Sequence, residues 1–173
     1  MKILVCISSV PDTTSKINFT ADKSAFDKNG IQWVINPYDE FALTKAVKLQ
    51  ESQGATVTIA TVGDEATEAV MRKALAIGAN DAIRVNAEPK DSITVAKELA
   101  KIVEEGGYDV VLCGKESIDY NGAAVPAMIA QLLNRPFVNA CVGLEVTGAE
   151  APAVREIEGG KETLSVKLPA VIA

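Results

Sequence analysis

The strongest constraint on the fold is a regular alternation of apolar, strand-like runs with segments of helical periodicity. Apolar runs occupy Lys2 to Ser8, Thr56 to Val62, Asp81 to Val85 and Tyr108 to Cys113. Helical patterns follow them over residues 39–51, 65–77, 92–105 and from Val125 onward. Continuous apolar strands that alternate with helices are typical of a parallel sheet buried on both faces. The pattern predicts a doubly wound, mainly parallel, Rossmann-like α/β domain with helices on both faces.

Two parts of the chain depart from this alternation. Residues 17–20 and 31–35 alternate apolar and polar side chains, which predicts a hairpin that turns around residues 27–30. Beyond Pro136, residues 137–147, 153–158 and 162–168 read as strands, with paired glycines at 159–160. We therefore expect an antiparallel hairpin at the end of the chain, with Arg155 and Glu162 as a cross-strand pair.

Composition and charge narrow the class of protein. A length of 173 residues with 48% hydrophobic residues predicts one nucleotide-binding α/β domain, residues 1–173. The net charge of −6 argues against nucleic-acid binding, which needs a basic face. No apolar run approaches membrane-spanning length, so we expect no membrane insertion and a cytoplasmic location.

Cysteine and histidine usage limits the chemistry. Cys6, Cys113 and Cys141 lie in apolar runs and read as core residues. The chain has no histidine, which excludes a Cys–His nucleophile and the usual zinc sites. We expect neither catalytic residues nor a metal site.

The segment from Gly114 to Pro126 follows the fourth apolar run and opens a helix. Ligands of open parallel sheets bind at the carboxyl ends of strands where strand order reverses, here expected between the first and fourth runs. The small residues 122–124 would let backbone amides approach an anion at the helix N-terminus. The segment is neither a Walker A loop nor a Gly-x-Gly-x-x-Gly fingerprint. The alternative is an ordinary turn in which Asp119 or Asn121 caps the helix.

Four segments resemble the β subunit of electron-transfer flavoproteins, and the resemblance spans the whole chain. The longest, Ala153 to Ala173, is similar to the family signature with its basic residue, paired glycines and Leu-Pro ending. Asn36 to Glu40 is similar to the Asn-Pro-aromatic element of the family. Residues 74–79 and 114–119 are similar to its Ala-Leu-x-x-Gly-Ala helix ending and its Gly-Lys/Arg-Gln-x-Ile-Asp loop.

This resemblance implies an electron carrier without catalytic residues of its own. Such a subunit shares an FAD with an α subunit, accepts electrons from a flavin-dependent dehydrogenase and carries AMP or, in a bifurcating-like branch, a second FAD. By family position the nucleotide would be held by Cys6, Asn36, Pro37, Tyr38, Asp39, Val62, Asp119, Tyr120, Asn121, Gly122, Ala123, Ala124, Val125 and Ala130. Family members continue into a docking loop and an arm around the α subunit, and we expect the domain to lack both.

Several roles stay open at this level. Asn36 either reads a ligand or holds the turn before Pro37, and Asp119 is either a ribose acceptor or a local cap. Tyr38 either lies near the isoalloxazine ring or acts as a hydrophobic staple. Lys115 pairs either with a phosphate or with the surroundings of Glu116.

Two other classes of function are alternatives. A stand-alone ATP- or AMP-binding sensor of the universal-stress-protein type shares the doubly wound plan, but its Gly-x-x-Gly phosphate loop has no clear equivalent here. An adenylating ATP pyrophosphatase would need a Ser-Gly-Gly-x-Asp-Ser loop after the first strand. This chain has Ser-Ser-Val-Pro-Asp at residues 8–12.

Overall fold

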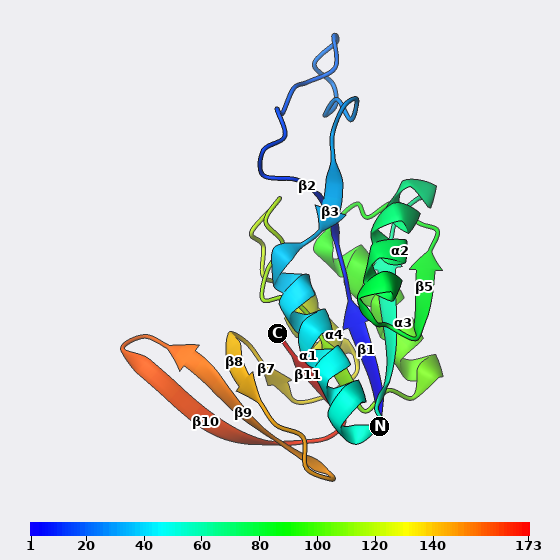
Figure 1. Ribbon diagram of the computed structural model, residues 1–173. Helices are drawn as coiled ribbons and strands as arrows, with labels where there is room; N and C mark the ends of the chain where they lie inside the picture. The colour runs from blue at the N-terminus through cyan, green and yellow to red at the C-terminus, as the bar shows by residue number, and fades with distance from the viewer.

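A six-stranded parallel sheet forms the centre of the molecule (Figure 1). The computed structural model describes residues 1–173. In spatial order the sheet contains β5 (Asp81–Val85), β4 (Thr56–Val62), β1 (Lys2–Cys6), β6 (Val110–Leu112), β11 (Ala170–Ile172) and β7 (Phe137–Val138). All five neighbouring pairs run parallel. The predicted α/β fold class is confirmed.

Two helices cover each face of this sheet, as the doubly wound prediction requires. Helices α1 (Pro37–Gln53) and α2 (Glu68–Ile77) lie in front of the sheet in Figure 1, and α3 (Ser92–Gly106) and α4 (Val125–Leu132) lie behind it. Alternate β1 side chains divide between the two layers, because successive side chains of a strand point to opposite faces. Ile3 and Val5 pack with the α1/α2 layer, whereas Leu4 and Cys6 pack with the α3/α4 layer.

Strand order reverses between β1 and β6, as predicted. From β1 the chain proceeds to β4 and β5 on one side, and then crosses to β6 on the other. Strands β1 and β6 are direct neighbours, with Val5 opposite Leu112. The carboxyl ends of these two strands therefore open onto the switch point.

The predicted hairpin of residues 17–20 with 31–35 is wrong. Strand β3 (Trp33–Ile35) pairs instead with β2 (Ser9–Pro11), in a two-stranded antiparallel ladder. Val10 lies opposite Val34 in this ladder and is fully buried, whereas Ile17 and Phe19 are 58% and 70% exposed. Burial of Val10 thus favours the shorter β2 as the partner of β3. The segment between these two strands, residues 12–32, projects from the body of the molecule (Figure 1).

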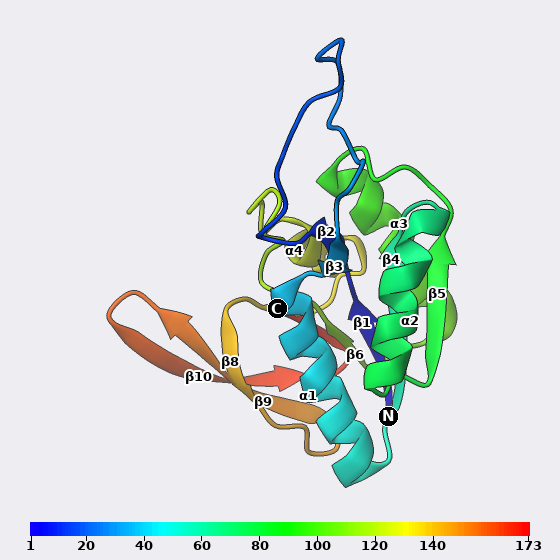
Figure 2. The same ribbon diagram turned by 45° about the horizontal axis from the view of Figure 1, so that its top comes forward.

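The end of the chain is only partly the predicted antiparallel addition. A separate sheet contains β8 (Cys141–Leu144), β9 (Glu150–Ile157) and β10 (Gly160–Lys167), and it projects on the side away from β5 (Figure 2). The expected pair of Arg155 and Glu162 lies across β9 and β10 and forms an ion pair.

Two details of this region correct the sequence-based prediction. The single strand expected over 137–147 is divided between two sheets, because Ala140 adopts a left-handed conformation (φ 48°). The last strand, β11, returns to the main sheet and pairs in parallel with β6 and β7. None of the helices combines the length and the apolar character needed to cross a bilayer.

Candidate nucleotide site at the carboxyl ends of the strands

Three of the central strands end at one edge of the sheet with side chains that point to the same face. Cys6 ends β1, Val62 ends β4 and Cys113 follows β6, and all three are buried in the α3/α4 layer. The pKa of the Cys113 thiol is raised, first by its hydrogen bond to Cys6 and then by burial. Two of the predicted site residues, Cys6 and Val62, therefore lie in this buried apolar layer at the strand ends.

Asp39 joins the ends of β1 and β6. Its Oδ2 accepts a hydrogen bond from the Ser8 N–H (2.8 Å), and its Oδ1 accepts one from the Gly114 N–H (2.9 Å). The side chain reaches them from the first turn of α1 and is 4% exposed. Burial raises the pKa of its carboxyl to about 7, although the bonds from Ser8 and Gly114 favour the ionised form.

Asn36 holds the loop that follows β6. Its Nδ2 donates to the Glu116 carbonyl (2.8 Å), and its Oδ1 accepts from the Ile118 N–H (3.3 Å). The residue is fully buried and is the N-cap of α1, but its side chain makes no bond to the helix amides. The Asn36 amide is thus hydrogen-bonded to the loop backbone.

Gly114 lies in direct contact with the start of α1. A Cβ atom on this glycine would be 2.4 Å from Asp39 Oδ1 and 2.7 Å from Tyr38 Cβ. Only glycine allows the loop to come this close. The neighbouring Lys115 places its Nζ 5.0 Å from the centroid of the Tyr38 ring and 3.5 Å from Glu116 Oε1. Tyr38, which is half-buried, therefore forms part of the wall between α1 and the loop.

The tip of the loop is exposed and turns on itself. Asp119 accepts hydrogen bonds from the Ser117 hydroxyl and from the Tyr120 N–H (3.0 Å). Asn121 and Ala123 have left-handed backbones, with φ of 50° and 48°. Tyr120 is 88% exposed. The Asp119 carboxylate is thus engaged in its own turn.

Helix α4 begins behind this tip without a side-chain cap. Its N-cap is Ala124, and no side chain bonds to its first-turn amides. The alternative in which Asp119 or Asn121 caps the helix is therefore wrong. Uncapped first-turn N–H groups carry partial positive charge and can bind an anion. The space beside Gly122 is open, because no atom lies within 4 Å of the position that a Cβ would take.

The predicted site residues fall into four groups. Asn36, Tyr38 and Asp39 contact the loop or the strand ends directly, while Cys6, Val62 and Ala130 lie together in the buried α3/α4 layer. Pro37 is an exposed first-turn residue of α1. The remaining predicted residues form the loop tip and the entrance to α4, namely Asp119, Tyr120, Asn121, Gly122, Ala123, Ala124 and Val125.

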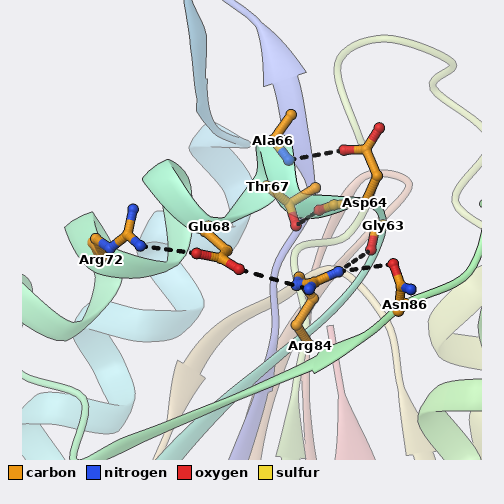
Figure 3. A network of polar contacts seen from close by, with 8 residues as sticks. All are labelled: Gly63, Asp64, Ala66, Thr67, Glu68, Arg72, Arg84 and Asn86. Carbon is orange, nitrogen blue, oxygen red and sulfur yellow. Dashed lines mark hydrogen bonds and ion pairs between the residues drawn. The ribbon is translucent and has the colours of Figure 1, made fainter.

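The sequence analysis did not identify the brace on the turn after β4, by which we mean the set of polar contacts that holds residues 63–68 in place (Figure 3). Arg84 of β5 donates to the Gly63 carbonyl (3.2 Å) and lies 3.6 Å from Glu68 Oε1. Glu68 also pairs with Arg72 (2.8 Å), and the Asp64 carboxylate accepts from the Ala66 N–H (3.0 Å). The Arg84 contact has no local signal in the sequence.

The opposite edge of the sheet has a different character. An open depression at the amino ends of β1 and β6 is lined by Met1, Asp109, Gly148, Ala149, Leu168 and Pro169. No group of three or more Cys, Asp and Glu side chains is arranged to hold a metal ion.

Comparison with known proteins gives a consistent result. The family model described as electron transfer flavoprotein domain matches residues 24–173. The electron transfer flavoprotein subunit beta of Bacillus subtilis (strain 168) is 34% identical over 176 residues, covering 99% of this chain and 68% of that protein. The protein of the same name from Syntrophomonas wolfei is 36% identical, covering 100% and 69%. That from Dictyostelium discoideum is 34% identical, covering 100% and 70%.

Proposed function

Because this chain belongs to the electron transfer flavoprotein β-subunit family, we propose that its carboxyl-edge crevice binds an adenine nucleotide, either AMP or the adenine end of a second FAD. The chain then acts as one half of a cytoplasmic heterodimer. Its α subunit shares a flavin with it, and a flavin-dependent dehydrogenase supplies electrons. The three cysteines are free, as is usual in a reducing compartment.

One observation carries the nucleotide proposal. Asn36 and Asp39, both at the start of α1, hold the loop after β6 against the end of β1 at the point where strand order reverses. This is the place where doubly wound sheets bind nucleotides. The side chains therefore shape a crevice between two loops at that edge.

The residues around the crevice suit an adenosine phosphate. The uncapped N-terminus of α4 offers backbone N–H groups to a phosphate, next to open space at Gly122. The buried side chains of Cys6, Val62 and Ala130 at the α3/α4 layer offer apolar contact to a flat base. The loop tip from Asp119 to Val125 would close over the ribose and phosphate.

The flavin shared with the α subunit would lie near Tyr38 in this proposal. Tyr38 is half-buried with its Cβ next to Gly114, and the Lys115 ammonium lies over its ring. When bound, FAD supplies the redox chemistry of the complex. This chain contributes position and electrostatic environment and needs no general base, which accords with an electron carrier that is not itself an enzyme.

The test is to purify the chain together with its α subunit and to identify what the complex holds. We expect a yellow complex that releases AMP and one FAD, or two FAD, as measured by mass spectrometry of the denatured supernatant. One flavin with AMP indicates an ordinary carrier, whereas two flavins indicate the bifurcating-like branch. Substitution of Gly122 by Val should reduce the AMP or second FAD and leave the shared flavin. A complex in which only the α subunit retains nucleotide overturns the proposal.

A further inference from the structure

Two carboxylates join the same pair of strands at opposite ends. At the amino ends, Asp109 Oδ2 accepts a hydrogen bond from the Lys2 N–H (2.7 Å), which ties the residue before β6 to the start of β1. At the carboxyl ends, Asp39 accepts from Ser8 and Gly114. Only the second carboxylate lies at the proposed nucleotide crevice.

Both carboxylate oxygens of Asp39 accept hydrogen bonds from backbone N–H groups. One oxygen faces the end of β1 and the other faces the start of the loop after β6. At 4% exposure the carboxylate lies beneath these segments rather than in the open crevice. Its geometry is that of a group that fixes two loops, which differs from a direct contact to ribose.

We propose that Asp39 is a positioning residue whose carboxylate sets the separation of the loops after β1 and β6, and thereby the affinity of the crevice for its nucleotide. This inference rests on the proposed function. No backbone hydrogen bond joins Ser8 to Gly114 beyond the sheet. The Asp39 carboxylate bridges them directly, whereas Asn36 connects Ser8 to residues 116 and 118, further along the loop, through its backbone N–H and its side chain.

The surroundings make this bridge sensitive to protonation. The titratable side chains nearest in sequence to Asp39 and its two partners are Tyr38 and Glu40 of α1, Cys6 at the end of β1, and Cys113, Lys115 and Glu116 after β6. Glu40 pairs with Lys73 (3.4 Å), and Lys115 pairs with Glu116 (3.5 Å). The hydrogen-bond partners of Asp39 are uncharged, so burial dominates and places the pKa of the carboxyl at about 7. A proton on either oxygen weakens one of the two bridging bonds.

The experiment compares two isosteric variants of the complex with its α subunit, Asp39→Asn and the matched control Asp109→Asn. In Asp39→Asn one carboxylate oxygen becomes an NH2 group, which cannot accept a hydrogen bond. The backbone N–H of either Ser8 or Gly114 therefore loses its acceptor, and the bridge is broken on that side. We expect the AMP dissociation constant at pH 8 to rise by about tenfold or more, the scale of a hydrogen bond to a charged acceptor. Asp109→Asn should lower the melting temperature but change the dissociation constant by less than about twofold.

A pH profile separates positioning from a general loss of structure. The AMP phosphate itself titrates near pH 6, so the informative quantity is the ratio of variant to wild-type dissociation constants. We expect this ratio to shrink between pH 8 and pH 6, because the wild type loses the ionised bridge that the Asn variant already lacks. A ratio that is constant with pH, or Asp39→Asn binding within about twofold of wild type, overturns the inference.

A second measurement needs no variant and covers the case in which Asp39→Asn does not fold. Hydrogen exchange of the wild-type complex, corrected for intrinsic rates, reports protection at Ser8 and Gly114. We expect protection there to fall between pH 8 and pH 6 while that at Lys2 stays constant. Unchanged protection at all three residues overturns the inference. A wild-type complex that binds no adenine nucleotide refutes the proposed function instead.

Discussion

Gly114 and Tyr38 approach so closely that a Cβ on the glycine would lie 2.7 Å from the Cβ of the tyrosine. The loop after β6 and the first turn of α1 are therefore packed backbone to side chain. This contact fixes the start of the loop against α1. It also explains why a glycine begins the loop, which the sequence pattern alone does not reveal.

Substitution Gly114→Ala should force these two segments apart. We expect it to lower the free energy of unfolding by about 1–3 kcal/mol, the usual cost of overpacking, as measured by urea denaturation. Gly122→Ala is the matched control, because its Cβ would enter open space. It should change stability by less than about 0.5 kcal/mol. Equal effects of the two substitutions would contradict the close contact.

A different result is expected from Gly122→Val. Its Cβ would enter open space in front of α4. AMP affinity should fall by about tenfold or more while the melting temperature stays near that of wild type, since the branched side chain blocks approach to the helix amides. Gly160→Val in β10 is the control, because its Cβ also meets no atom within 4 Å. The nucleotide site is misplaced if both variants bind AMP like the wild type.

Asn36 should be important for stability as well as for the site. Its replacement by Ala leaves the Glu116 carbonyl and the Ile118 N–H without their buried partner. We expect a loss of roughly 2–3 kcal/mol in the free energy of unfolding. Asn139→Ala, which removes an exposed bond to Arg155 (2.9 Å), should cost less than about 0.5 kcal/mol. Similar losses for both asparagines would show that the loop does not depend on Asn36.

The turn after β4 offers a test of the brace in Figure 3. Arg84→Ala removes the bond to the Gly63 carbonyl and the contact with Glu68, and its side chain is only 20% exposed. We expect a loss of about 1–2 kcal/mol. Arg72→Ala breaks an exposed i,i+4 pair with the same glutamate and should cost less than about 0.5 kcal/mol. The reverse order of these two losses would contradict the role of Arg84.

The sequence predicted the elements whose cause is local. The bounds of β4 and β5 agree with the apolar runs. The switch between β1 and β6 followed from the order of elements, because crossovers of one hand leave few topologies.

The features that the sequence could not supply depend on distant partners. The donor and acceptor contacts of Asn36 lie 80 and 82 residues away, and Arg84 reaches a carbonyl 21 residues earlier. Strand β3 pairs with β2 rather than with the better alternating residues 17–20, because burial of Val10 decides the pairing. Local periodicity contains no information on such contacts.

The titration of Asp39 gives the final expectation, and its sign follows from the raised pKa. The folded state binds the proton with a pKa of about 7, whereas the unfolded carboxyl has its ordinary value of 3.8. Between these values the folded state holds more protons, so the free energy of unfolding rises as the pH falls from about 7 to about 4. Asp39 contributes up to about 1.4 kcal/mol per pH unit to this slope.

Measurement of urea unfolding at several pH values in wild type and in Asp39→Asn isolates this contribution. The difference in unfolding free energy, wild type minus variant, should grow in favour of the wild type as the pH falls toward 4 and should level off above pH 7. Parallel pH profiles would show that Asp39 is ionised at its ordinary pKa in the folded state. The ionised form needed for the bridge is thus the less stable one, as is common where a buried group serves a binding site.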